Sequence, residues 1–192
     1  ELAVKLYRKA VKQGDSNAAL RLGQLAGAGQ LEGKAPPRLA VPWAIAAAQA
    51  GDVAALDWVK AQAERGLRSA LTAYGIWLLE HEQSAEAAAA FQRAAAVGDI
   101  EAQFQLGVLL TKGDGLEQDY VQAHAWLNIA AAGGHAEAGQ TRAVIADLMT
   151  PEQVAQAQQI AREFFEQAAQ TPPVTEQSQT QTQTAPESGR SE

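Results

Sequence analysis

Along residues 1–170, apolar and polar side chains follow one another in short blocks that are typical of amphipathic helices. A strict alternation of apolar and polar positions, which would indicate a strand, never lasts for more than four residues. Glycines separate the blocks, and glycine suits the end of a helix because it accepts a left-handed backbone. The pattern therefore predicts an all-α body. Its ten expected helices lie at residues 1–13, 16–28, 38–50, 52–65, 67–81, 84–97, 99–112, 119–133, 135–148 and 151–169.

Two of these helices have a clear capping sequence at their start. Thr150 can cap the last helix, Pro151 is tolerated at its first position, and Gln153 completes a capping box with Thr150. Asp119 is followed three residues later by Gln122, which gives the same arrangement. Helices are therefore predicted to begin directly after Asp119 and Thr150.

The glycines between helices keep a common register with other small residues. An alanine stands four residues after each of five glycines, and a further glycine stands nine residues after three of them. The leading glycines are Gly14, Gly51, Gly66, Gly98 and Gly134, and the further ones are Gly23, Gly75 and Gly107. The leading glycines are separated by 37, 15, 32 and 36 residues, and apart from the 15 these lengths match a helix–turn–helix repeat.

Large residues occupy a second fixed place in the repeat. Trp43, Trp58 and Trp126 each stand eight residues before a leading glycine, so we expect them to pack in the core against small residues of the next unit. Such stacking predicts an α/α solenoid in which each unit contacts mainly its neighbours. Residues 52–65 have the spacing of both a first and a second helix, and we expect a shortened unit and a local change of twist there.

The residues from Ala102 to Gly134 resemble one unit of a known repeat family. Ala102-Gln-Phe-Gln-Leu-Gly107, the Gly113-Asp-Gly-Leu116 loop and Ala123-His-Ala-Trp-Leu127 are similar to a Sel1-like repeat (SLR), a branch of the tetratricopeptide-like (TPR-like) solenoids. Residues 14–51 resemble a second copy with a degenerate loop, and residues 67–98 are closer to a plain tetratricopeptide unit. The resemblance implies a right-handed α/α superhelical solenoid of about four to five repeats over residues 1–170. Residues 1–14 resemble a second helix without its partner, so we expect the protein to extend further at its N-terminus.

Composition narrows the possible functions. The absence of cysteine excludes disulfides and cysteine-ligated metal sites, and the net charge of −7 argues against a nucleic-acid partner. No apolar run reaches the ~18 residues that a membrane span needs. Residues 171–192 contain two apolar residues besides proline, Val174 and Ala185, so they are predicted to form a disordered tail.

Catalytic and metal-binding motifs are incomplete throughout the sequence. His81-Glu82 begins like a zinc protease motif, but Ala85 stands where the second histidine is needed. The glycine pairs at 27–29 and 113–115 lack the strand and the lysine of a phosphate-binding loop, and no serine lies in a nucleophile elbow. His124 and His135 have no ligand spacing. We therefore expect no enzyme activity, no cofactor and no metal.

By similarity with tetratricopeptide units, the first helix of each repeat would line a concave face that binds a protein or peptide partner. The family resemblance implies a scaffold role in complex assembly, often in the bacterial envelope or in signalling. The expected partner-binding residues are Asn17, Gln24, Ser69, Thr72, Ile76, Trp77, Glu101, Phe104, Val108 and Lys112. Two alternatives stay open: Ile76, Phe104 and Val108 belong to the core, or Trp77 and Tyr74 stack on a polysaccharide or peptidoglycan chain.

Overall fold

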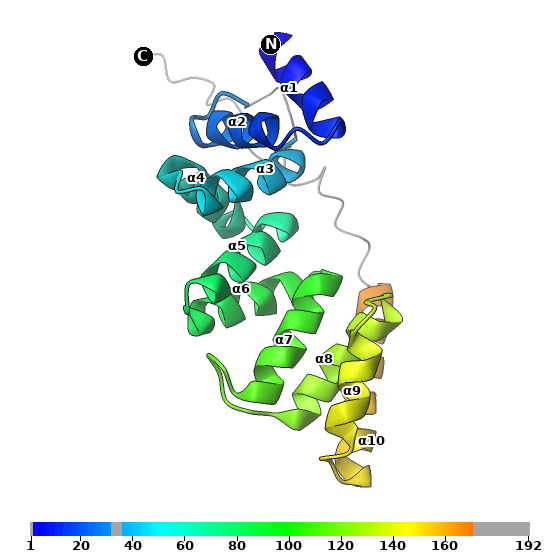
Figure 1. The fold of residues 1–192 in the computed structure, drawn as a ribbon. Coiled ribbons are helices and arrows are strands. Elements are labelled where there is room, and N and C mark those ends of the chain that lie inside the picture. The colour runs from blue at the N-terminus through cyan, green and yellow to red at the C-terminus, as the bar shows by residue number, and fades with distance from the viewer. Residues whose placement is uncertain (1, 32–35, 171–192) are drawn as a thin grey trace, which may run out of the picture.

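The computed structural model describes residues 2–31 and 36–170, and within them it contains ten helices and no strand (Figure 1). The helices are α1 (Leu2–Lys12), α2 (Ser16–Gly27), α3 (Pro37–Gln49), α4 (Val53–Glu64), α5 (Arg68–Glu80), α6 (Ser84–Ala96), α7 (Ile100–Lys112), α8 (Tyr120–Ala132), α9 (Ala138–Ala146) and α10 (Pro151–Gln170). The all-α prediction is confirmed. The predicted tail at 171–192 and part of the α2–α3 insertion, at 32–35, lie outside the described residues.

The turns between units explain the register of the leading glycines. All five have positive φ angles, between 83° for Gly66 and Gly98 and 95° for Gly134, so each glycine supplies the left-handed turn after a helix. In three turns the next residue is an aspartate, and its carboxylate accepts the backbone N–H three residues later. These bonds join Asp15 to Ala18, Asp52 to Ala55 and Asp99 to Ala102, at 2.9–3.0 Å. One Gly-Asp-x-x-Ala segment thus ends one helix and starts the next.

The repeated small residues lie where helices approach most closely. Each alanine four residues after a leading glycine is at most 4% exposed. At Gly23 an added Cβ would lie 2.0 Å from the carbonyl oxygen of Trp43, so α2 and α3 touch backbone to backbone. At Gly75 it would lie 2.7 Å from the Phe91 ring, and at Gly107 it would lie 2.7 Å from Leu127 Cγ. The three further glycines therefore mark the contact between the two helices of each unit.

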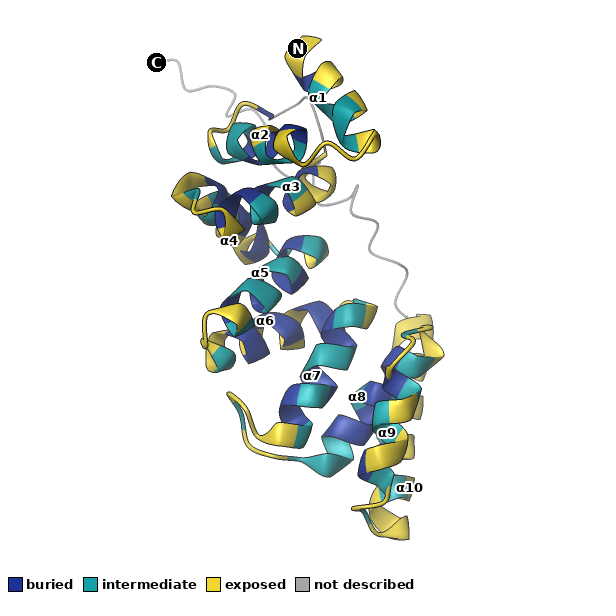
Figure 2. Cartoon of the chain, in the orientation of Figure 1, coloured by how far each residue is buried: buried dark blue, intermediate teal, exposed yellow. Residues whose placement is uncertain are grey.

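The helices stack in chain order into a solenoid, with buried residues on their inner faces and exposed residues along the outside (Figures 1 and 2). α4 packs against α2, α3 and α5, and α5 also contacts α3. The predicted odd unit at 52–65 is therefore a single helix inserted between the pair α2–α3 and the pair α5–α6. Trp43, Trp58 and Trp126 are half-buried and pack against the edges of the two core clusters.

The C-terminal end departs from a simple stack, because both α9 and α10 pack on α8. α9 begins three residues later than expected, since the His135 side chain lies against α7 instead of starting a helix. The predicted capping box of α10 is present: the Thr150 N–H donates to Gln153 Oε1 at 2.9 Å, and the Gln153 N–H donates to Thr150 Oγ1 at 3.3 Å. Asp119 caps α8 through the Gln122 N–H at 2.9 Å.

Candidate interaction surface

Helices α5 and α7, the first helices of two successive units, are linked at both ends. At their N-terminal ends, Arg68 Nε lies 3.9 Å from Asp99 Oδ2. At their C-terminal ends, Leu79 of α5 and Val108 of α7 line the same cavity. Because like ends are neighbours, the two helices run in the same direction along one side of the solenoid. Residues spaced three and four apart on each helix therefore share a common face.

The cavity between the C-terminal ends of α5 and α7 has a volume of about 540 Å³. We call it the α5–α7 hollow. Its lining combines apolar side chains with both signs of charge, and consists of Leu79, Glu82, Ser84, Gln105, Val108, Leu109, Lys112 and Asp114. The loop after α7 lies against the α5–α6 turn, since a Cβ added to Gly115 would lie 2.3 Å from the carbonyl of Ser84. Two turns therefore bound the hollow at one end.

The N-terminal half of α7 carries an aromatic and charged cluster. The Phe104 ring stacks on the His135 ring, with centroids 4.0 Å apart. His135 Nδ1 accepts the Glu137 N–H at 3.3 Å, and its Nε2 lies 3.3 Å from Glu101 Oε2. Glu101 also accepts a bond of 2.7 Å from Gln105. The predicted residues Glu101 and Phe104 therefore share one partner, His135, which holds both side chains in place.

On α5 the predicted residues differ in their environment. Trp77 is half-buried, and the His81 ring covers it with centroids 3.8 Å apart; the Tyr74 ring lies 6.2 Å away. His81 donates from Nδ1 to the Trp77 carbonyl oxygen at 2.7 Å. Ile76 is half-buried and packs on the core while keeping part of its surface accessible, as Phe104 does.

Two other expected residues on α5 are less accessible than a groove requires. Thr72 is 8% exposed, and its hydroxyl donates to the Arg68 carbonyl oxygen at 3.3 Å. Ser69 is half-buried, and its Oγ is buried with no hydrogen-bond partner. The Thr72 hydroxyl is therefore used within its own helix, and the Ser69 hydroxyl oxygen is not exposed to solvent. We leave Thr72 and Ser69 out of the candidate surface.

The two expected residues of α2 lie elsewhere. Asn17 is exposed, and the side chain of Gln24 accepts a hydrogen bond from Arg21 at 2.8 Å. Helix α4 packs against both α2 and α5, and neither Asn17 nor Gln24 lines the α5–α7 hollow. Of the expected residues, Val108 and Lys112 line the α5–α7 hollow, whereas Ile76 packs against the core and Asn17 and Gln24 lie on α2.

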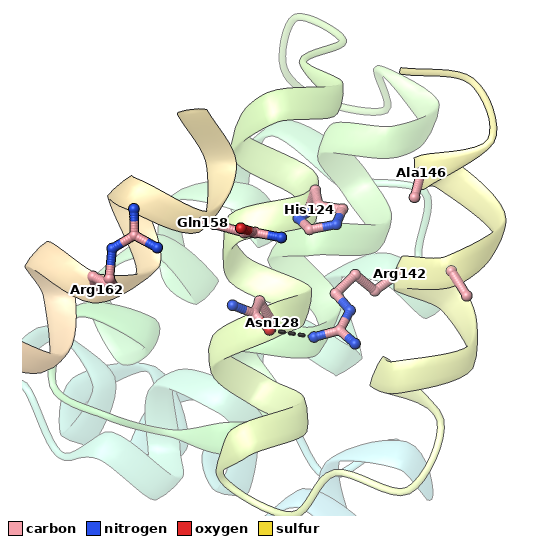
Figure 3. A pocket seen from close by; sticks show the side chains of 7 residues that line it. His124, Asn128, Arg142, Ala146, Gln158 and Arg162 are labelled. Carbon is pink, nitrogen blue, oxygen red and sulfur yellow. Dashed lines mark hydrogen bonds between the residues drawn. The ribbon is translucent and has the colours of Figure 1, made fainter. Parts of the chain in front are cut away.

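A second cavity, of about 430 Å³, lies between α8, α9 and α10, and its lining was not anticipated from the sequence (Figure 3). We call it the α8–α10 pocket. It is lined by His124, Asn128, Arg142, Ala143, Ala146, Gln158 and Arg162. Arg142 donates to Asn128 Oδ1, and Arg162 donates to Gln159 Oε1 at 2.7 Å. No sequence signal could have identified this pocket, because its residues come from three helices with no shared spacing.

His124 is the buried titratable group of the α8–α10 pocket. His124 is 5% exposed, and its Nδ1 is buried without a hydrogen-bond partner among the described residues. Burial lowers the pKa of His124 below its ordinary value, and the positive charge of Arg142 lowers this pKa further. Both burial and the charge of Arg142 therefore favour the neutral form of His124.

Among residues 2–31 and 36–170, no group of three or more histidine, aspartate or glutamate side chains could hold a metal ion. None of the described helices is both long enough and apolar enough to cross a bilayer.

Comparison with known proteins places this arrangement among bacterial helical repeats. A sequence model described as Sel1 repeat matches residues 1–15, 16–52, 100–135 and 152–170, which together make up more than half of the chain. The crystal structure of a protective antigen with an SLR fold, present in uropathogenic Escherichia coli strains, is 25% identical with a TM-score of 0.56. That alignment covers 98% of this chain and 45% of the antigen.

A further solved structure, a Sel1 repeat protein from Oxalobacter formigenes, is 28% identical with a TM-score of 0.42. The alignment covers 71% of this chain and 47% of that protein. Each alignment therefore covers less than half the length of the solved structure. No curated protein sequence matches it.

Proposed function

This chain belongs to the Sel1 repeat family, and we propose that it is a non-catalytic scaffold that binds a partner protein or peptide along α5 and α7. Proteins with Sel1 repeats are generally protein-interaction scaffolds. The proposal extends to a role in assembling a bacterial complex of the envelope or of a signalling pathway.

The observation that carries the proposal is the α5–α7 hollow at the end of two parallel first helices. Its volume of about 540 Å³ is in the range of ligand cavities, roughly 300–1,000 Å³. Leu79, Val108 and Leu109 offer apolar surface, while Lys112 and Glu82 line the hollow with charges of opposite sign. An extended peptide presents apolar side chains and free backbone amides together, so it matches such a mixed lining.

The α7 stripe continues this surface toward the N-terminal end of the helix. Glu101, Phe104, Val108 and Lys112 follow the three- and four-residue spacing of one helix face. Glu101 and Phe104 are already ordered by His135, so binding would cost little additional side-chain entropy there. A preordered stripe that leads into a hollow supports the binding of a segment several residues long.

Site-specific photocrosslinking tests the proposal directly. A photoreactive phenylalanine analogue is introduced at Lys112, an exposed residue that lines the hollow, and separately at Gln92, an exposed position of α6. We expect discrete crosslinked protein species in the source cells from the Lys112 position and none from the Gln92 position. Equal crosslinking at both positions, or none at Lys112, would contradict the proposal.

The glycan alternative requires an accessible indole face at Trp77. One face of this ring is already covered by His81 at 3.8 Å, so a sugar ring would have to displace the histidine or use the remaining face. Titration with peptidoglycan fragments distinguishes the two functions, because stacking on Trp77 would change the tryptophan fluorescence. We expect no change in fluorescence, and a saturable change would favour the glycan function instead.

A further inference from the structure

The α8–α10 pocket has the composition of an anion site. It contains two arginines and one histidine, and none of the residues that line it is an aspartate or glutamate. The carboxylates closest in sequence, Asp147 next to Ala146 and Glu163 next to Arg162, do not line it. This composition is unusual for a chain with a net charge of −7, where carboxylates outnumber cationic side chains.

The arginines of the pocket have neutral hydrogen-bond partners. Arg142 donates to the amide oxygen of Asn128, and Arg162 donates to the amide oxygen of Gln159. Neither guanidinium pairs with a carboxylate among the described residues. An arginine has five N–H donors in a planar fork, so both side chains keep donors for a planar, negatively charged group.

The unpartnered ring nitrogen of His124 is a second observation at this site. Buried polar atoms nearly always have a hydrogen-bond partner, and the exceptions call for an explanation. His124 lies on α8 at the floor of the pocket, between Arg142 of α9 and Gln158 of α10 (Figure 3). Its Nδ1 has no hydrogen-bond partner among the described residues, although the polar residues Asn128, Arg142 and Gln158 line the same pocket.

We propose that the α8–α10 pocket binds a carboxylate group of a peptide, with Arg142 and Arg162 as charged donors and His124 and Asn128 at the floor. The carboxylate is either a chain terminus or an acidic side chain. The volume of about 430 Å³ exceeds what a single small ion fills, and the short side chains Ala143 and Ala146 leave room for the atoms beside the carboxylate. This site is separate from the α5–α7 hollow and does not depend on it.

Nuclear magnetic resonance of the whole chain tests the proposal with four probes. These are acetyl-Gly-Ala-Ala with a free carboxylate, the same peptide as its C-terminal amide, acetyl-Gly-Glu-Gly-amide, and sodium phosphate. We expect the first or the third probe to shift the resonances of His124, Asn128 and the Arg142 side chain, and the amide peptide to leave them unchanged. A stronger response to acetyl-Gly-Ala-Ala would identify the carboxylate as a chain terminus. A stronger response to acetyl-Gly-Glu-Gly-amide would identify it as an acidic side chain.

A matched pair of variants assigns the effect to the pocket. Arg142→Gln keeps an amide donor for Asn128 but removes the charge, and we expect it to weaken carboxylate binding at least tenfold. Arg21→Gln is the control, because Arg21 is an exposed arginine of α2 that also donates to an amide oxygen, that of Gln24. We expect this control to bind as the unmodified chain does.

A second readout does not depend on the variants. A bound carboxylate favours protonated His124, so the carboxylate peptide should raise the pKa of His124, and its amide analogue should not. Arg142 of α9 is the charged group that acts on His124, and Arg162 of α10 lines the same pocket. Three results would overturn the proposal: equal shifts with the amide peptide, shifts with phosphate alone, or no shift with either carboxylate peptide.

Discussion

The contact between α2 and α3 gives a quantitative prediction through Gly23→Ala. The added Cβ would lie 2.0 Å from the Trp43 carbonyl oxygen and 2.7 Å from the Ala47 Cβ, whereas non-bonded carbon atoms pack best at about 3.5–4.0 Å. Two of the three nearest atoms belong to the backbone of α3, so no side chain can rotate away and α2 must withdraw. Overpacking costs about 1–3 kcal/mol, and here we expect the upper end because the obstacle is backbone.

Helix propensity opposes this cost only in part. Alanine is better than glycine in a helix interior by about 1 kcal/mol, so the net loss is about 2 kcal/mol. In a solenoid each unit contacts mainly its neighbours, so the loss is local. We expect the amides of α2 and α3 to exchange with solvent about 30-fold faster, and those of α7 and α8 to be unchanged.

The matched control is Gly139→Ala in α9. Nothing lies within 4 Å of the Cβ that this change adds, so the change acts through helix propensity alone. We expect the free energy of unfolding to rise by about 0.5–1 kcal/mol. Hydrogen exchange followed by mass spectrometry measures both variants in the same experiment. If hydrogen exchange in α2 and α3 were unchanged in Gly23→Ala, the backbone contact between these helices would be refuted. The proposed role of Gly23, which is to allow that close approach, would be refuted with it.

Three further predictions concern single residues. Asp99→Ala removes the cap of α7 and the partner of Arg68, and should cost about 1 kcal/mol of unfolding free energy in urea; a loss below about 0.3 kcal/mol would contradict the capping role. Glu82 has a φ of 60°, so Glu82→Gly should raise the melting temperature by relieving a left-handed backbone, and a lower melting temperature would mean that the side chain stabilises the turn. Because folding lowers the pKa of His124, the unfolded chain binds a proton on this histidine at a higher pH than the folded chain does. Stability should therefore fall as the pH drops below about 6.5, and less so in His124→Gln, as urea unfolding at pH 7 and pH 5 can measure; equal losses in both proteins would exclude the histidine as the cause.

Much of the candidate surface could be anticipated from spacing on one helix. Glu101, Phe104, Val108 and Lys112 follow the periodicity of α7, and the structure keeps them half-buried or exposed, as a surface stripe requires. Thr72 has the equivalent spacing on α5 and is buried. Periodicity determines which residues share a face, but the neighbours of that face depend on the inserted α4, which changes the order of packing around α5.

The sequence by itself determined the helices, their ends and the repeat. These features depend on interactions between residues a few positions apart: a glycine with positive φ, an aspartate that accepts the N–H three residues later, and an alanine on one helix face. The small residues at fixed offsets also disclosed the stacking, because each unit packs on the next one along the chain.

Only the tertiary structure decided which polar and aromatic residues of different helices come together. His135 leaves the start of α9 to stack on Phe104, and Arg142 and His124 meet because α9 and α10 both pack on α8. These encounters depend on the distances and angles between helices, which are set by the packing of whole helix faces. No spacing along the chain encodes such angles, so the α8–α10 pocket became visible only in the folded protein.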